Sequence, residues 1–159
     1  MSKSAVTNIV VAGLGGQGVL KASDIVADVA VSARHDVKKS EVHGMSQRGG
    51  SVASDVRYGE KVFSPMVPPG EADYLVVLAP DQVDVNLPLL KSGGKLIEPA
   101  MVDENKLSNK KSANVAQLGI LSRYLEFTDE QWLTAIKKNL PEKLHEANVE
   151  AFYAGKNVG

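Results

Sequence analysis

The chain has 159 residues, enough to bury one full hydrophobic core, and we expect a single domain over residues 1–159. Its 18 basic and 19 acidic residues give a formal net charge of −1, which argues against nucleic acid or a polyanionic membrane surface as partner. The sequence contains no cysteine, which excludes a disulfide framework and an iron–sulfur cluster held by this chain. No signal-type segment and no run of 18 apolar residues occur, so we expect a soluble, cytoplasmic protein.

The N-terminal part predicts a strand, a glycine turn and a helix, in that order. Residues 8–12 are apolar and rich in β-branched side chains, and residues 19–30 carry apolar side chains at helical spacing. The turn between them provides candidate cofactor-binding residues, because a helix N-terminus offers free N–H groups and partial positive charge to an anion. These residues are Gly13, Gly15, Gly16, Gln17 and Gly18. A tight crossover without a ligand is the alternative.

Three of these glycines also satisfy the pattern G-x-G-x-x-G, which is typical of dinucleotide-binding turns. That interpretation needs an acidic residue about 20 positions further on, at the end of a second apolar strand. Asp36 has a plausible spacing. The residues around it, 34–40, are too polar for a strand buried on both faces, and this disfavours NAD or FAD.

A second polar run collects a carboxylate, an imidazole, a hydroxyl, a carboxamide and a guanidinium around glycines. We predict that it forms an interface or active-site loop, with a solvated turn as the alternative. Arg48 could pair with a carboxylate or phosphate, and Glu41 and His43 could bond across an interface or transfer protons; Glu41 and Arg48 could instead brace the loop itself. The candidate residues are Glu41, His43, Gly44, Met45, Ser46, Gln47, Arg48, Gly49 and Gly50.

The middle of the chain continues as an α/β pattern. Residues 51–58 alternate and predict a strand with one solvated or interface face; residues 59–60 predict a turn, after which 61–63 could pair back as a hairpin. Residues 65–70 predict a proline-rich loop, and the apolar run 74–79 predicts a central strand. Asp81 is expected as the N-cap of a helix over 82–90, or else as a ligand-facing residue, and 94–98 predicts a further strand.

The C-terminal third predicts three helices. The first covers residues 115–127, the second begins with the capping signature Thr128-Asp-Glu-Gln131, and the third covers 145–153 after Pro141. Trp132 shares a helical stripe with Ile136 and Leu140, so a core position is expected rather than a stacking platform. The histidines are too scattered to predict a zinc site, and we expect no metal site in this chain.

The two glycine runs, together with Ser64-Pro-Met66 and Gly70-Glu-Ala-Asp-Tyr74, resemble the gamma-type domain of 2-oxoacid:ferredoxin oxidoreductases. Within that family, the run from Glu41 to Gly50 is most similar to the beta subunits of indolepyruvate oxidoreductases. The likeness covers residues 8–80 closely and resumes at 114–119 and 148–152. It implies a Rossmann-like three-layer α/β domain with a mixed, mainly parallel sheet. The polar stretch 103–112 replaces a strand and helix usual in the family, so it is either a loop or the sign of a smaller sheet.

The resemblance also implies a function. Such enzymes oxidatively decarboxylate an arylpyruvate with coenzyme A to an acyl-CoA and pass electrons to ferredoxin. Thiamine diphosphate, magnesium and the iron–sulfur clusters are expected in a larger partner subunit, and this chain is expected to be inactive alone. A stand-alone nucleotide- or CoA-binding module without catalytic activity is the alternative.

Overall fold

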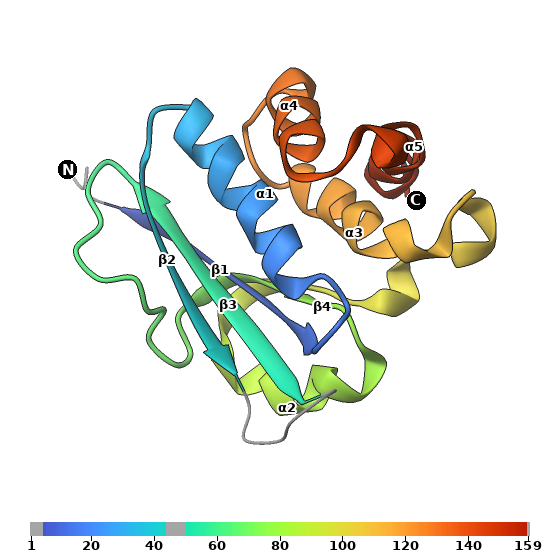
Figure 1. The fold of residues 1–159 in the computed structure, drawn as a ribbon. Helices are drawn as coiled ribbons and strands as arrows, with labels where there is room; N and C mark the ends of the chain where they lie inside the picture. Colours follow the sequence, from blue (N-terminus) through green and yellow to red (C-terminus); the bar gives the residue numbers. More distant parts are fainter. Residues whose placement is uncertain (1–4, 44–49, 159) are drawn as a thin grey trace.

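The computed structural model describes residues 5–43 and 50–158, which form one five-stranded mixed sheet with helices packed against it (Figure 1). The strand order is β2-β3-β1-β4-β5. Strand β1 runs parallel to β4, and β4 runs parallel to β5, whereas β3 is antiparallel to both of its neighbours. The strands are β1 (Val6–Leu14), β2 (Asp36–His43), β3 (Ser51–Gly59), β4 (Ala72–Val77) and β5 (Leu90–Ile97).

The helices are α1 (Val19–Ser32), α2 (Val83–Asn86), α3 (Ala113–Ser122), α4 (Asp129–Asn139) and α5 (His145–Lys156). Short 3-10 turns lie between them: η1 (Pro80–Gln82), η2 (Leu87–Leu89), η3 (Pro99–Met101), η4 (Glu104–Lys106), η5 (Lys110–Ser112) and η6 (Glu142–Leu144). The polar stretch 103–112 is thus two single turns joined by loop, and the sheet ends at β5.

The two faces of the sheet are covered unequally. Alternate β1 side chains point to opposite faces, so Ile9 and Val11 join the core under α1, α3, α4 and α5, while Val10 joins a smaller cluster on the other side. That second cluster is completed by Val83 and Leu89 of the α2 region and by Val67. Figure 1 shows the four longer helices gathered on one side of the strands. The predicted open α/β fold is confirmed, with one thick and one thin outer layer.

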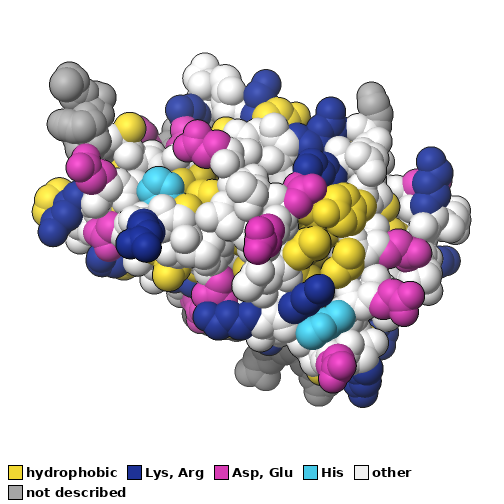
Figure 2. All heavy atoms as spheres, turned by 90° about the horizontal axis from the view of Figure 1, so that it is seen from above, with side chains coloured by type: hydrophobic (Ala, Val, Ile, Leu, Met, Phe, Trp, Pro, Cys, Tyr) yellow, Lys and Arg dark blue, Asp and Glu magenta, His cyan; other side chains and the backbone are white. Residues whose placement is uncertain are grey.

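Several elements agree with their sequence patterns. The capping box at the start of α4 is formed: Thr128 Oγ1 accepts from the Gln131 amide at 3.1 Å, and Gln131 Oε1 accepts from the Thr128 amide at 2.9 Å. Trp132 is fully buried, where its ring packs near Phe127 and Phe152, so the expected core position is confirmed. Figure 2, seen from above Figure 1, shows acidic and basic side chains interspersed over the surface.

The predicted hairpin at residues 61–63 is wrong. Strand β3 is already paired with β1 on one side and β2 on the other, so neither of its edges can accept a third strand. Residues 60–70, called the strap below, instead cross the thinly covered face and are held by side chains. Asp36 Oδ2 accepts from the Val62 amide at 2.8 Å, and Asp55 Oδ2 accepts from the Val67 amide at 2.8 Å.

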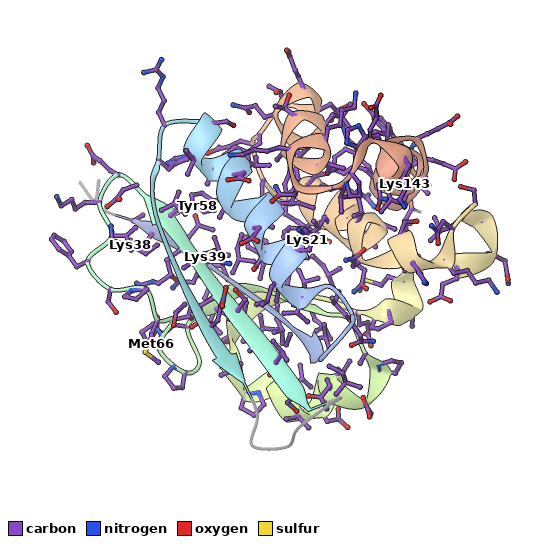
Figure 3. The ribbon with its side chains drawn as sticks, in the orientation of Figure 1. Lys21, Lys38, Lys39, Tyr58, Met66 and Lys143 are labelled. Carbon is purple, nitrogen blue, oxygen red and sulfur yellow. The ribbon has the colours of Figure 1, made fainter. Side chains whose placement is uncertain are left out.

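The strap is also held by a basic side chain of β3. The Arg57 guanidinium donates to the carbonyl oxygens of Ser64 and Met66 at 2.8 and 3.3 Å. Met66 itself is more than half exposed, and Figure 3 shows it at the side of the sheet remote from the four longer helices. Carboxylates and a guanidinium from the strands therefore replace the ladder bonds that a hairpin would have used.

The predicted helix over 82–90 with Asp81 as N-cap is also wrong. Asp81 lies inside the 3-10 turn η1, and α2, which lasts four residues, starts without a side-chain cap. Pro88 explains the early stop, because proline lacks an amide donor and its ring clashes with the preceding helical turn. The helix predicted at 115–127 ends earlier than expected, at Ser122. Residues 34–40, which are too polar for a strand buried on both faces, include the start of β2, which lies at the edge of the sheet.

Candidate functional site

The glycine turn between β1 and α1 is closed by the side chain of Gln17. Its Oε1 accepts from the Leu14 amide at 2.7 Å, and its Nε2 donates to the Leu78 carbonyl at 3.4 Å, just after β4. A Cβ atom at Gly13 would stand 2.8 Å from Gln17 Oε1, so a larger residue there would displace this side chain. Gln17 therefore joins the carboxyl ends of the two central parallel strands.

Two glycines of the turn adopt backbone conformations that other residues rarely take. Gly16 has φ = +88° and Gly18, the N-cap of α1, has φ = +82°. A Cβ atom at Gly16 would meet nothing within 4 Å, whereas one at Gly18 would stand 2.6 Å from Nδ2 of Asn114 on α3. Gly16 is thus needed for its conformation alone, and Gly18 for its conformation and for close approach of α3.

The second polar run reaches the same edge of the sheet as the glycine turn. The Gly15 amide donates to the Gly50 carbonyl at 2.9 Å, a main-chain bond between the two runs. The backbone register agrees, because Val52 pairs with Gly13 on one side and with His43 on the other. The structure therefore brings the two runs together, although 35 positions separate the bonded glycines.

Only part of the second run can be placed. Glu41 and His43 belong to strand β2 rather than to a loop, and Gly50 precedes β3. The predicted residues Gly44, Met45, Ser46, Gln47, Arg48 and Gly49 lie outside the described residues.

Glu41 takes part in a small ionic cluster. Lys39 Nζ lies 3.1 Å from Glu41 Oε2 and 2.6 Å from Asp24 Oδ1 on α1. Figure 3 shows Lys39 on β2 beside that helix. Partial burial of the ammonium group acts to lower the pKa of Lys39, but the bonds to Asp24 and Glu41 outweigh it and raise that pKa. Glu41 thus helps to fix the edge strand against α1 as a carboxylate.

Asp36 is far from the glycine turn. Gly59 pairs with Asp36 and also with Val6, the first residue of β1, whereas the glycine turn follows the last residue of that strand. At about 3.3 Å per residue, eight residues of strand separate the two by roughly 26 Å. Hydrogen bonds from the Val62 amide and from Lys38 lower the pKa of Asp36, whose carboxylate holds the strap. It cannot contact a ribose at the glycine turn, which removes the basis for the dinucleotide interpretation.

Three polar residues near the turn were not predicted as site residues. Gln117, 2% exposed on α3, donates through Nε2 to the Val77 carbonyl at 2.7 Å and to the Ile97 carbonyl at 3.4 Å. Asn114 Nδ2 lies 3.5 Å from the Gly18 carbonyl. Ser51 Oγ donates to Gln82 Oε1 at 2.9 Å. The signal available in the sequence was the presence of amides within an otherwise apolar helix, which a buried position must satisfy.

The family of the chain follows from two comparisons. The pyruvate ferredoxin/flavodoxin oxidoreductase family matches residues 8–102. The chain is also 33% identical to the indolepyruvate oxidoreductase subunit IorB of Thermococcus kodakarensis, over 93% of both proteins. The chain belongs to the pyruvate ferredoxin/flavodoxin oxidoreductase family. The membership inferred from the two glycine runs is thereby confirmed.

Solved structures show how this family's fold recurs. The gamma subunit of a keto/oxoacid ferredoxin oxidoreductase from Geobacter sulfurreducens has a TM-score of 0.82 at 22% identity, covering 98% of this chain and 97% of that one. A 2-oxoglutarate:ferredoxin oxidoreductase from Magnetococcus marinus also has a TM-score of 0.82, at 18% identity, but this chain covers only 31% of that longer chain. The same oxidoreductase-family fold therefore occurs both alone and as part of a longer chain.

Two observations concern membranes and metals. No helix in residues 5–43 and 50–158 has the length and apolar composition needed to cross a bilayer. Nor do the described residues contain a cluster of three or more histidine, aspartate or glutamate side chains able to hold a metal ion. The sequence offers no thiolate for an iron–sulfur cluster.

Proposed function

We propose that this chain is the subunit without clusters of an indolepyruvate or arylpyruvate:ferredoxin oxidoreductase. The complete enzyme would decarboxylate the 2-oxoacid oxidatively, transfer the acyl group to coenzyme A and reduce ferredoxin. Similarity over 93% of both chains to a protein named as an indolepyruvate oxidoreductase subunit is the observation that carries this proposal. Further support comes from a relative in Archaeoglobus fulgidus with the same name, 30% identical over 94% of both chains.

The partner in this proposal is a larger subunit that holds thiamine diphosphate, magnesium and the iron–sulfur clusters. The chemistry of the present chain supports this division, because it has no cysteine to bind a cluster. Its own contribution would be one gamma-type domain, residues 1–159, that presents two adjacent glycine loops to the partner. The Gly15–Gly50 bond supports a joint role, since the position of either loop constrains the other.

A tagged copy of the chain, recovered from its native host, tests the assignment. We expect a large cysteine-rich subunit to copurify, and the complex to reduce ferredoxin only when an arylpyruvate and coenzyme A are both present. The chain purified alone should be colourless and free of iron. Stoichiometric iron in the isolated chain, or a complex that ignores arylpyruvates, would contradict the proposal.

Arg48 tests the role of the second loop. Arg48→Ala should leave the melting temperature of the isolated chain unchanged, because a polar loop contributes little to a core. Activity of the reconstituted complex should fall by the equivalent of about 2–5 kcal/mol, the usual loss when one partner of a buried charged contact is removed. Arg48→Lys should restore only part of it, because an ammonium group lacks the two-pronged geometry of guanidinium. A sharp drop in melting temperature with full activity in the folded fraction would instead make Arg48 an internal brace.

A further inference from the structure

A slot of about 340 Å³ lies on the thinly covered face of the sheet, between the strap and the α2 region. Its floor is formed by Val10 of β1 and Ala53 of β3, and apolar side chains line it from both sides, Met66 and Val67 from the strap and Val85 from α2. The four longer helices cover the opposite face, so the sheet itself separates the slot from them. Small-molecule sites are typically mostly apolar hollows of this size with a few polar groups.

One end of the slot has a buried acceptor. Asp55 lines the slot and is only 8% exposed. Its Oδ2 accepts from the Val67 amide, whereas its Oδ1 receives no hydrogen bond from the residues that the structure describes. Burial raises the pKa of this carboxyl group, because its charged form has lost water without full compensation. A donor on a ligand would supply the missing hydrogen bond.

The other end of the slot has a buried donor. Gln82, also 8% exposed, accepts from Ser51 through its Oε1, and its Nε2 has no acceptor within the described part of the chain. Ser51 and Asp55 lie four residues apart on the same face of β3, so roughly 13 Å of strand separates the two polar ends. After a hydrogen bond at each end, this length suits one ring with a short side chain.

The charges around the slot favour a neutral ligand. Arg57, two residues beyond Asp55 on the same face of β3, acts to lower the pKa of Asp55 and donates to carbonyl oxygens of the strap. A ligand ammonium group would therefore approach a second cation. Among the described residues, no lysine or arginine lines the slot, so nothing in it would neutralise a ligand carboxylate. The anionic 2-oxoacids of the proposed function are poorly suited to this site.

We infer that the slot binds a neutral, single-ring aromatic compound with a hydroxyl or N–H donor on the ring and a carbonyl group on a short side chain. Asp55 Oδ1 accepts from the ring donor, and Gln82 Nε2 donates to the carbonyl. The ring lies over Ala53, where the thioether of Met66 can pack against it. This site goes beyond the proposed function: if the slot failed to bind, the copurification and arylpyruvate assays would be unaffected.

Nuclear magnetic resonance titration of the isotopically labelled full chain tests the site with three probes. 4-Hydroxyphenylacetamide has both polar groups, 4-methoxyphenylacetamide has its ring donor blocked, and 4-ethylphenol lacks the carbonyl. We expect the first probe to shift the amide signals of Ser51, Asp55 and Val67 saturably. The methyl ether should bind about tenfold more weakly, because it cannot donate to the carboxylate, and 4-ethylphenol should also bind more weakly, by a few fold.

Variants at the two ends of the slot separate the contacts. Asp55→Asn keeps the Val67 bond through its oxygen and turns an amide N–H towards the slot, which can donate to either ring oxygen, so the preference for the phenol over its methyl ether should disappear. Asp36→Asn is the matched control, because Asp36 also holds the strap, through the Val62 amide, but does not line the slot; this variant should keep the preference. Gln82→Met removes the other donor with little change in length, so 4-hydroxyphenylacetamide should lose its advantage over 4-ethylphenol.

The inference is overturned if 4-hydroxyphenylacetamide does not bind saturably, or if the amide signals that it shifts lie away from the slot. It is also overturned if Asp55→Asn and Asp36→Asn have the same preference between the phenol and its methyl ether. In that case the strap as a whole, and not the carboxylate in the slot, would determine binding.

Discussion

Replacing Gly18 measures how closely the start of α1 is fitted against α3. The φ of +82° at this N-cap costs alanine roughly 1 kcal/mol relative to glycine. The new Cβ atom would also stand 2.6 Å from Asn114 Nδ2, which must then move away from the Gly18 carbonyl. Losing that contact adds about 1 kcal/mol, so Gly18→Ala should lower the free energy of unfolding by about 2 kcal/mol in all.

Gly16 provides the matched control for this change. Its φ of +88° imposes similar strain, but a Cβ atom there meets nothing within 4 Å, so Gly16→Ala should lower the free energy of unfolding by only about 1 kcal/mol. Urea denaturation followed by circular dichroism measures both values. In an Asn114→Ala background, Gly18→Ala should cost only the conformational part, giving a coupling of about 1 kcal/mol. Equal losses for the two glycines, or additive losses in the double variant, would refute the proposed fit.

Two further changes test the core and the strap. Gly155→Ala would place a Cβ atom 1.7 Å from the Ala116 carbonyl oxygen, so α3 and α5 must separate. The free energy of unfolding, measured in urea, should therefore fall by about 3 kcal/mol. The control Gly93→Ala, at an open position with φ +84°, should lower it by only about 1 kcal/mol. Burial raises the pKa of Asp55 above its ordinary 3.8, so this residue's contribution to stability is full below pH 3.8 and is lost as the pH rises through the folded value. The side-chain oxygen of Asn in Asp55→Asn can still accept from the Val67 amide, so this variant should no longer lose stability as the pH rises. Unfolding curves recorded from pH 4 to 8 measure the difference. If the variant and the natural chain lose stability equally over that range, Asp55 is not the group responsible.

Local chemistry was enough to predict much of the fold. The glycine turn, α1 and the capping box of α4 each depend on residues close together in the sequence, and all three formed as expected. The predicted hairpin at 61–63 was wrong because it depended on residues far away in the sequence. Whether β3 has a free edge depends on β1 and β2, which pair with it from distant parts of the chain. Alternation within a segment carries no information about such pairing.

In the candidate site, too, local patterns could be predicted from the sequence and contacts between distant segments could not. The two glycine runs could be recognised separately by composition, but their main-chain bond between Gly15 and Gly50 depends on the register of three strands. Gln117 was passed over because an amide among apolar residues does not reveal which carbonyls it will meet. Its partners are the ends of β4 and β5, and these come together only in the finished sheet. Side chains that join separate elements were therefore the least predictable part of the site.

The two edge strands of the sheet affect how readily the chain aggregates with copies of itself. Within the described residues, strands β2 and β5 each have a neighbouring strand on one side only, and an unpaired strand edge is a surface on which identical chains can stack into aggregates. Charged side chains stand on both strands: Asp36, Lys38, Lys39 and Glu41 on β2, and Lys91 and Lys95 on β5. Charged side chains on an edge strand disfavour its pairing with the edge of a second copy, because pairing would remove water from them, so both edges of this sheet are protected against edge-to-edge aggregation.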